Sequence, residues 1–245
     1  MMEFTMEDSS KTVAYLAIFT ALGAVLDMIP TIPFFYGGVW DSWLFVLSPL
    51  FGIILGPYLG ALSVGMSNII GHMVYARDPL ELLFMWGGAL CAASAGWVYQ
   101  KRWRPVLGIY SLLLIGYFVY PVSWVLPLIG IWDILVGYVV TIIFGYAVLS
   151  GRLESMRNNS AVFLFAAVIG LELDILLRVF ILVPGQIWTI MFTLEALQVI
   201  WLSAGIITPL KVVIATIATL TLAHSLIPIL EGGSGEMEVL NETES

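Results

Sequence analysis

The chain has 245 residues, of which 60% are hydrophobic and 11% are charged, and its mean hydropathy is +1.01. A water-soluble domain of this length cannot bury so much apolar surface, so the composition excludes that class and indicates a protein embedded in a lipid bilayer. The formal charge of -8 arises at the ends of the chain, because eight of the 17 acidic residues lie in 1–11 and 231–245. Both ends are expected to be solvated acidic tails, and the C-terminal tail is expected to be disordered.

Apolar runs fill most of 12–230 and predict a single all-α membrane domain. Because about 20 apolar residues make one helical crossing, the chain has room for eight or nine membrane segments. The expected segments are 12–30, 43–55, 57–75, 80–99, 105–120, 127–149, 161–183, 186–204 and 208–229. A charge at the bilayer centre costs about 2.5–3.5 kcal/mol, so the segment with Glu195 and Gln198 either crosses or folds back on the outer side.

The stretch "SPLFGIILGPYLGALSVGMSNIIGH", residues 48–72, predicts two short helices meeting at a corner. Proline has no amide hydrogen and disfavours helical geometry in the residue before it, so the chain is expected to break between Gly56 and Pro57. Gly52, Gly56 and Gly60 are four residues apart, a spacing that lets helix backbones approach closely in lipid. The alternative is a single kinked helix.

Basic residues gather in two turns of the expected bundle. These residues are Lys101, Arg102, Arg104, Arg152 and Arg157. Short cytoplasmic loops carry an excess of Lys and Arg, so we expect both turns and the N-terminus to lie on the cytoplasmic side of the cell membrane. The aromatic loop 31–42 then faces outside, as does Arg77, the one exception to the pattern.

Several features, taken in order, resemble one family of membrane proteins. The first segment carries Ala17 and Ala21 in "AIFTA" and is followed by the outer aromatic loop. Then come the turn "GIILGPYLGALSVG", a helix ending in "AGWVYQKRW" and, late in the chain, "IITPLKVVIATIATL". Together they look like the substrate-binding S component of an energy-coupling factor (ECF) transporter, the vitamin-uptake branch of the ABC transporters. The resemblance covers 12–104 and 161–229, and 105–149 reads as a helical hairpin added to the family's six-helix core.

The resemblance implies a transport function without catalysis. An S component binds a small vitamin or related nutrient near the outer surface and associates with a membrane coupling protein driven by two cytoplasmic ATPases. That coupling protein would contact Ala17 and Ala21, although the alternative is that these alanines pack inside the chain's own bundle. The sequence contains no GxxxxGK[ST] loop, so energy from ATP must come from another subunit. Neither a cofactor nor a nucleic acid partner is expected.

The outer loop supplies one set of candidate binding residues. A small-molecule site is mostly apolar and aromatic with a few polar groups that fix orientation, a description that fits Tyr36, Trp40, Asp41 and Trp43. The alternative is that these aromatic residues anchor the protein at the membrane interface.

Ionisable and polar residues inside apolar runs supply the second set, because such groups are costly in lipid and need a partner or a polar cavity. They are Glu81, Asp174, Arg178, Glu195 and Gln198. Asp174 and Arg178 are four residues apart and can instead form a structural ion pair. Glu81 can instead stabilise a helix N-terminus. The excess of acids favours a cationic or amine-bearing ring compound, such as a thiamine-like molecule, as the ligand.

Two other functions stay open at this point. A non-transporting membrane scaffold or assembly protein would also be built of apolar helices. An intramembrane serine protease would require Ser67 and His224 to meet as a dyad. With the single Cys91 and two histidines, His72 and His224, no transition-metal site is expected, and both histidines read as polar residues at helix ends.

Overall fold

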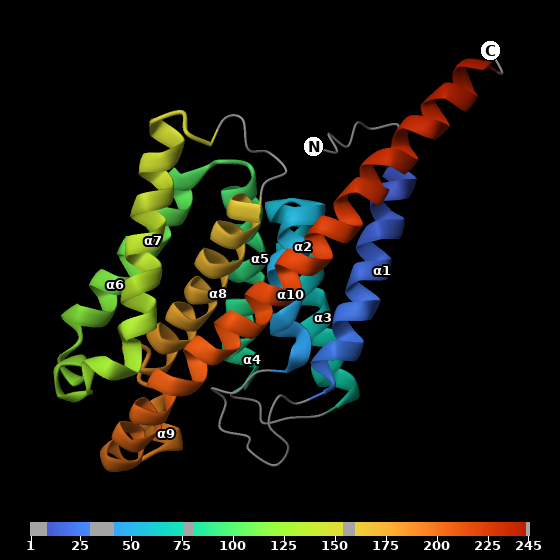
Figure 1. Cartoon of the computed structure of the whole chain (residues 1–245). Helices are drawn as coiled ribbons and strands as arrows, with labels where there is room; N and C mark the ends of the chain where they lie inside the picture. Colours follow the sequence, from blue (N-terminus) through green and yellow to red (C-terminus); the bar gives the residue numbers. More distant parts are fainter. Residues whose placement is uncertain (1–8, 30–41, 76–80, 154–159, 244–245) are drawn as a thin grey trace.

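The computed structural model describes residues 9–29, 42–75, 81–153 and 160–243, with side chains up to residue 229. These parts of the chain form helices joined by turns, and Figure 1 shows most of the helices running side by side as a bundle. Five of the described helices are long and apolar enough to cross a membrane. The all-α prediction is confirmed, and the architecture is compatible with a helical membrane bundle. The upper end of the bundle in Figure 1 is called the Gly56 end, and the lower end is called the Asp27 end.

The N-terminal part contains the predicted corner. Helix α1 (Ser9–Asp27) is followed by η2 (Trp43–Val46), α2 (Ser48–Leu55) and α3 (Pro57–Val74). Gly56 separates α2 from α3 with a φ of +81°, a left-handed value that favours glycine. The two helices pack against each other as a hairpin, and Pro57 begins the second helix. The prediction of two short helices is therefore confirmed.

Glycines at the α2–α3 hairpin are required by close backbone contact. A Cβ atom on Gly60 would lie 2.7 Å from the Cα atom of Gly52, and one on Gly52 would collide with the Ala92 carbonyl of α5 (Trp86–Tyr99). A Cβ atom on Gly96 would lie 2.6 Å from the Pro57 nitrogen. Small residues thus bring three helices together where larger side chains would hold them apart.

Helix α5 lies at the centre of the bundle. It continues the short α4 (Glu81–Phe84) and packs against α2, α3 and α8 (Ser160–Leu182). Its contact with α8 is close, because a Cβ atom on Gly170 would lie 2.9 Å from the Cys91 carbonyl oxygen. Cys91 itself is fully buried.

A helical hairpin, predicted as segments 105–120 and 127–149, forms the other flank of the bundle. Helix α6 (Trp103–Val119) and helix α7 (Trp132–Leu149) pack against each other and against α8. Two short 3-10 helices, η3 (Pro121–Val125) and η4 (Leu128–Ile131), connect them at the Asp27 end (Figure 1). Fully buried Tyr110 and Phe144 fill the space between this hairpin and α8.

The last third of the chain differs from the prediction. After the short α9 (Trp188–Met191), one helix, α10 (Leu194–Thr243), replaces the predicted segments 186–204 and 208–229 and contains Pro209 and Pro228. A proline inside a helix leaves the carbonyl four residues earlier without its amide donor. At Pro209 that carbonyl belongs to Gly205, and the Trp132 indole N–H donates to it at 2.7 Å. The helix also continues past residue 230, where the composition predicted a disordered tail.

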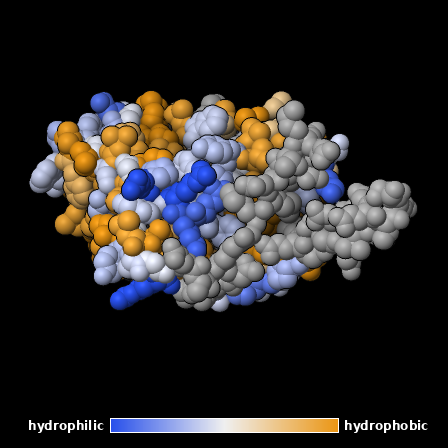
Figure 2. All heavy atoms as spheres, turned by 90° about the horizontal axis from the view of Figure 1, so that it is seen from above, coloured by the Kyte–Doolittle hydropathy of each residue, from blue (hydrophilic) through white to orange (hydrophobic). Residues whose placement is uncertain are grey.

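The surface has apolar sides and a polar end. Large hydrophobic side chains are exposed on the outward faces of several helices, among them Val13, Leu112, Ile115, Val139 and Ile206. Figure 2 looks onto the Gly56 end and shows hydrophilic side chains near its middle and at several places on its edge, with hydrophobic patches between them. Exposed apolar surface of this extent marks contact with a partner or with lipid.

Candidate functional site

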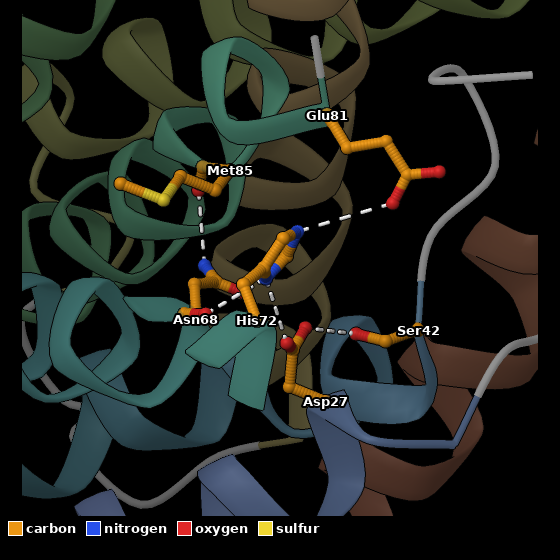
Figure 3. Close-up of polar contacts among 6 residues, drawn as sticks. All are labelled: Asp27, Ser42, Asn68, His72, Glu81 and Met85. Atoms are coloured by element: carbon orange, nitrogen blue, oxygen red, sulfur yellow. Dashed lines mark hydrogen bonds and ion pairs between the residues drawn. The ribbon is translucent and has the colours of Figure 1, made fainter. Parts of the chain in front are cut away.

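A cluster of polar side chains lies at the Asp27 end of the bundle (Figure 3). Asp27 is the last residue of α1, Ser42 precedes η2, Asn68 and His72 belong to the last two turns of α3, and Glu81 begins α4. We call these five residues the Asp27 cluster. Four segments of the chain thus contribute to one site.

The imidazole of His72 lies at the centre of this cluster. Its Nδ1 atom is 3.0 Å from Asp27 Oδ2 and 2.7 Å from the Asn68 carbonyl oxygen, and its Nε2 atom is 3.9 Å from Glu81 Oε2. Both neighbours of Nδ1 are acceptors, so this nitrogen carries the hydrogen and donates it. Ser42 Oγ donates to the other oxygen of Asp27 at 2.6 Å.

The carboxylates of this cluster are almost completely buried. Asp27 is 2% exposed and Glu81 is 6% exposed, and the side chain of His72 between them is 9% exposed. A buried carboxylate is costly unless hydrogen bonds or a positive charge compensate it. Carboxylate oxygens are hydrogen-bond acceptors, so the groups gathered here suit contact with a positively charged or proton-donating group.

Close packing of α1 against α3 places Asp27 beside His72. On α3, Ser63, Ser67 and Gly71 are four residues apart and present a face of small side chains to α1. Ser67 Oγ bonds the Thr20 carbonyl oxygen at 3.0 Å, and a Cβ atom on Gly71 would collide with the Asp27 carboxylate. Small residues of this kind let membrane helices approach closely.

Asp174 and Arg178 form the ion pair that their spacing predicts. Arg178 Nε donates to Asp174 Oδ1 at 2.5 Å, and both side chains are largely buried. They lie against Gly87 in the first turn of α5, where a side chain would collide with the Asp174 carboxylate. The pair thus packs on α5, next to the α4 segment that carries Glu81, and α4 also contacts α8.

The other predicted residues are distributed differently. Trp43 is 40% exposed and stacks on Phe45 with ring centroids 6.2 Å apart. Glu195 is exposed in the first turn of α10, and Gln198 Nε2 donates to the Val125 carbonyl oxygen of η3 at 3.1 Å. The contacts found in the described parts of the chain do not join Glu195 or Gln198 to the Asp27 cluster. Tyr36, Trp40 and Asp41 lie outside the described residues.

Sequence reasoning selected Glu81 but missed the rest of this cluster. His72 was correctly read as a helix-end residue, since it lies in the last turn of α3, but its contacts with two carboxylates were missed. A usable signal was present, because Asp27 ends an apolar segment and Asn68 and His72 are four residues apart in another. Polar groups at such positions need partners in a membrane protein.

Ser67 and His224 have different partners, which bears on the protease alternative. Ser67 Oγ also bonds the Ser63 carbonyl oxygen at 2.7 Å. His224 Nε2 lies 3.1 Å from Ser160 Oγ, and its Nδ1 lies 2.8 Å from the Leu220 carbonyl oxygen. The described hydrogen bonds therefore do not assemble the Ser67–His224 dyad that this function requires.

Among the described residues, no group of three or more His, Cys, Asp or Glu side chains is arranged to hold a metal ion. Comparison of the chain with family models, with curated proteins and with solved structures found no match. The functional inference therefore depends on the geometry of the polar sites and on the sequence features given above.

Proposed function

We propose that this chain is the substrate-binding S component of an ECF-type importer and that the Asp27 cluster is the polar part of its binding site. One observation carries the proposal: two buried carboxylates and an imidazole converge from α1, α3 and α4 at one end of an apolar helical bundle. A few convergent polar groups in an otherwise apolar bundle suit a small nutrient better than a macromolecule. The chain itself performs no chemical reaction in this proposal.

The distribution of basic residues supports an outward-facing site. Lys101, Arg102 and Arg104 lie at the turn between α5 and α6, and Arg152 follows α7, so these four belong to the Gly56 end. Cytoplasmic turns carry the excess of basic residues, which orients the Gly56 end inward. The Asp27 end then faces the outside of the cell membrane, from which a nutrient arrives.

The charge of the cluster suggests the class of substrate. Asp27 and Glu81 provide two acidic groups, and the imidazole of His72 lies between them. Trp43 follows Ser42 in the chain and offers a partly exposed ring for stacking or a cation–π contact. A cationic or amine-bearing ring compound is the ligand that matches these groups, and thiamine is an available probe of that chemistry.

The surface of α1 supports the partner in this proposal. Ala17 and Ala21 are exposed, as is Ala14 on the same side of the helix, and they do not pack inside the bundle. A flat face of alanines permits close helix contact that separates easily, because no bulky side chain interlocks. The coupling protein would dock on this face, and two cytoplasmic ATPases would drive it.

Native mass spectrometry of the gently purified protein tests the proposal. A retained vitamin-sized molecule, or co-purified coupling and ATPase subunits, would support it. A protein without either that also fails to bind a panel of vitamins would favour the scaffold alternative instead.

A thiamine titration, followed by tryptophan fluorescence of the protein in lipid nanodiscs, tests the site itself. We expect Asp27→Asn and Glu81→Gln each to weaken thiamine binding at least about tenfold, the loss expected when a charge-assisted contact worth about 1.5–3 kcal/mol is removed. Thr221→Val is the matched control, because this exposed hydroxyl bonds within α10 away from the cluster. Unchanged affinity in both acidic variants would rule out the Asp27 cluster as the site.

A further inference from the structure

A second group of buried acidic residues lies where the α6–α7 hairpin meets α8 and α10. Glu172 of α8 and Asp133 of α7 are 4% and 3% exposed, and Tyr110 of α6 is fully buried. Thr208 of α10 contacts Asp133. We call these four residues the Glu172 site, and each comes from a different helix.

Asp133 connects the beginning of α7 to α10. The backbone N–H of Ile134 donates to Asp133 Oδ1 at 3.0 Å, and the Thr208 hydroxyl donates to Oδ2. The neighbouring Trp132 donates to the carbonyl of Gly205 that Pro209 leaves without an amide donor. Pro209 interrupts the hydrogen-bond ladder of α10, and Trp132 supplies a donor from another helix at that point. Asp133, the next residue after Trp132, therefore lies beside this interruption.

Glu172 lies near the middle of α8, ten residues before Leu182 and twelve after Ser160. Its side chain occupies the space beside Gly137 of α7, where a Cβ atom would lie 2.6 Å from both Glu172 Cγ and the Tyr110 hydroxyl oxygen. The Tyr110 hydroxyl donates its hydrogen to the Ile134 carbonyl oxygen at 2.7 Å. The Tyr110 hydroxyl therefore has no hydrogen left to donate to Glu172.

One carboxylate oxygen of Glu172 is buried without compensation. Oε2 has no hydrogen-bond partner in the described part of the chain. Leaving such a group unsatisfied costs more than forming an ordinary hydrogen bond gains, and the cost is larger for a charged group. This oxygen therefore needs a ligand or a proton.

The charged groups around Glu172 do not neutralise it. The titratable side chains that face it are Tyr110 from α6 and Asp133 from α7, and the latter is close enough to act on it electrostatically. The other described charged side chains on helices packed against α8 have different neighbours or are exposed: Arg104 lies over Trp103, Lys211 over Phe45, Glu81 beside His72, and Glu195 on the surface. Arg178 of α8 itself pairs with Asp174.

We propose that the Glu172 site binds a monovalent cation, either a Na⁺-like metal ion or a proton. Its candidate ligands are the carboxylates of Glu172 and Asp133 and the hydroxyl oxygens of Tyr110 and Thr208. All of them are oxygens, the donors that hard cations take. Acidic residues inside membrane helices mark ion or proton sites, and interrupted helices often contribute to them.

This site is separate from the Asp27 cluster and does not depend on what that cluster binds. The cation would join α7, α8 and α10 at the level of Pro209 and compensate both carboxylates. Its occupancy would therefore determine how firmly α10 is held by the α6–α7 hairpin.

Thermal unfolding of the full chain in nanodiscs tests for a metal ion. A ligand that binds only the folded state raises the unfolding temperature of the protein. The unfolding temperature is therefore measured while choline chloride is replaced by NaCl at constant ionic strength and pH. We expect a saturable rise with Na⁺ that is absent in Glu172→Gln. Glu81→Gln, which removes a buried carboxylate of the Asp27 cluster, is the matched control and should keep the Na⁺ response.

Infrared spectroscopy of the same samples tests for a proton. If the cation is a proton, acidification produces a protonated-carboxyl band that is missing in Glu172→Gln, and Na⁺ has no effect on unfolding. Thr208→Val provides a second variant that retains both carboxylates and nearly the same shape. It should raise the Na⁺ concentration at half-saturation about tenfold, or shift the pH at which the band appears.

The proposal is overturned if the wild-type protein shows neither a Na⁺ response nor a protonated carboxyl assigned to Glu172. It is also overturned if both Thr208→Val and Glu172→Gln behave like the wild type. If Glu172→Gln does not fold, wild-type behaviour of Thr208→Val alone overturns the proposal. Loss of thiamine binding in Glu81→Gln with an intact Na⁺ response would support both sites independently.

Discussion

The Asp27 cluster and the Glu172 site each bury two carboxylates, but they differ in what surrounds those acids. In the Asp27 cluster, an imidazole lies between Asp27 and Glu81 at the end of the bundle. In the Glu172 site, the neighbours of the acids are hydroxyl groups, and Glu172 lies in the middle of its helix. Position and neighbours, and not residue type, therefore separate a site suited to an arriving ligand from one suited to a resident cation.

The Asp174–Arg178 pair provides a reference for both sites, because its carboxylate is paired with a guanidinium group. Asp174→Asn removes the negative charge from a largely buried ion pair, so we expect a loss of about 3–5 kcal/mol in the free energy of unfolding. Denaturant unfolding in detergent micelles measures it. The double variant Asp174→Leu/Arg178→Met removes both charges and should recover most of the stability. A single-variant loss below about 1 kcal/mol would show that this pair is effectively solvated.

Two glycines permit a matched test of both sites. Gly71→Ala forces a methyl group against the Asp27 carboxylate, and Gly137→Ala forces one against Glu172 and the Tyr110 hydroxyl. Each substitution overpacks a buried contact and should cost about 1–3 kcal/mol of unfolding free energy. Gly108→Ala is the control, because a Cβ atom there has no neighbour within 4 Å.

The two glycine variants should also separate the functions. Gly71→Ala is expected to weaken thiamine binding and to keep the Na⁺ or proton response, whereas Gly137→Ala is expected to do the reverse. Equal effects of both variants on both ligands would mean that the two sites are one coupled unit.

The contact between Trp132 and Gly205 tests how firmly α10 is held beside the Glu172 site. Trp132→Phe leaves the Gly205 carbonyl without a donor, which should cost about 1–2 kcal/mol of unfolding free energy. Trp124→Phe is the control, since its indole donates to the Phe118 carbonyl at an exposed position. Thermal unfolding measures both. Equal losses would show that the proline site has no special need of its tertiary donor.

Gln198→Ala should have the smallest effect. Its side chain makes an exposed hydrogen bond to Val125, so we expect a change within about 0.5 kcal/mol in stability and no change in thiamine affinity. A tenfold loss of affinity in the titration would extend the binding site from the Asp27 cluster to the beginning of α10.

The sequence predicted those features that depend on neighbouring residues. Gly56 and Pro57 marked the corner between α2 and α3 because their backbone restrictions are local, and Asp174 and Arg178 were paired because four residues bring side chains together on any helix. The Asp27 cluster was not predictable in this way. Asp27 and His72 are 45 residues apart, and their contact depends on how α1 packs on α3.

The course of α10 and the Glu172 site show the same limit. Pro209 is a reasonable signal for a helix end, but the indole of Trp132 replaces the missing donor from a distant part of the chain, so the helix continues. Glu172 lies two residues before Asp174 in the chain, but no local pattern indicated that Tyr110 and Gly137 would lie beside it.

Helix α10 runs obliquely across the other helices in Figure 1, which has a mechanical consequence. Its apolar part, Leu194–Ile229, has 36 residues and would be about 54 Å long, against a hydrocarbon layer of about 30 Å. A helix with such a hydrophobic mismatch must tilt, and a thinner bilayer requires more tilt than a thicker one. Trp132 donates a hydrogen bond to α10 beside Pro209, and Asp133 accepts one from it there. A change in membrane thickness that tilts α10 therefore also changes the geometry around Glu172.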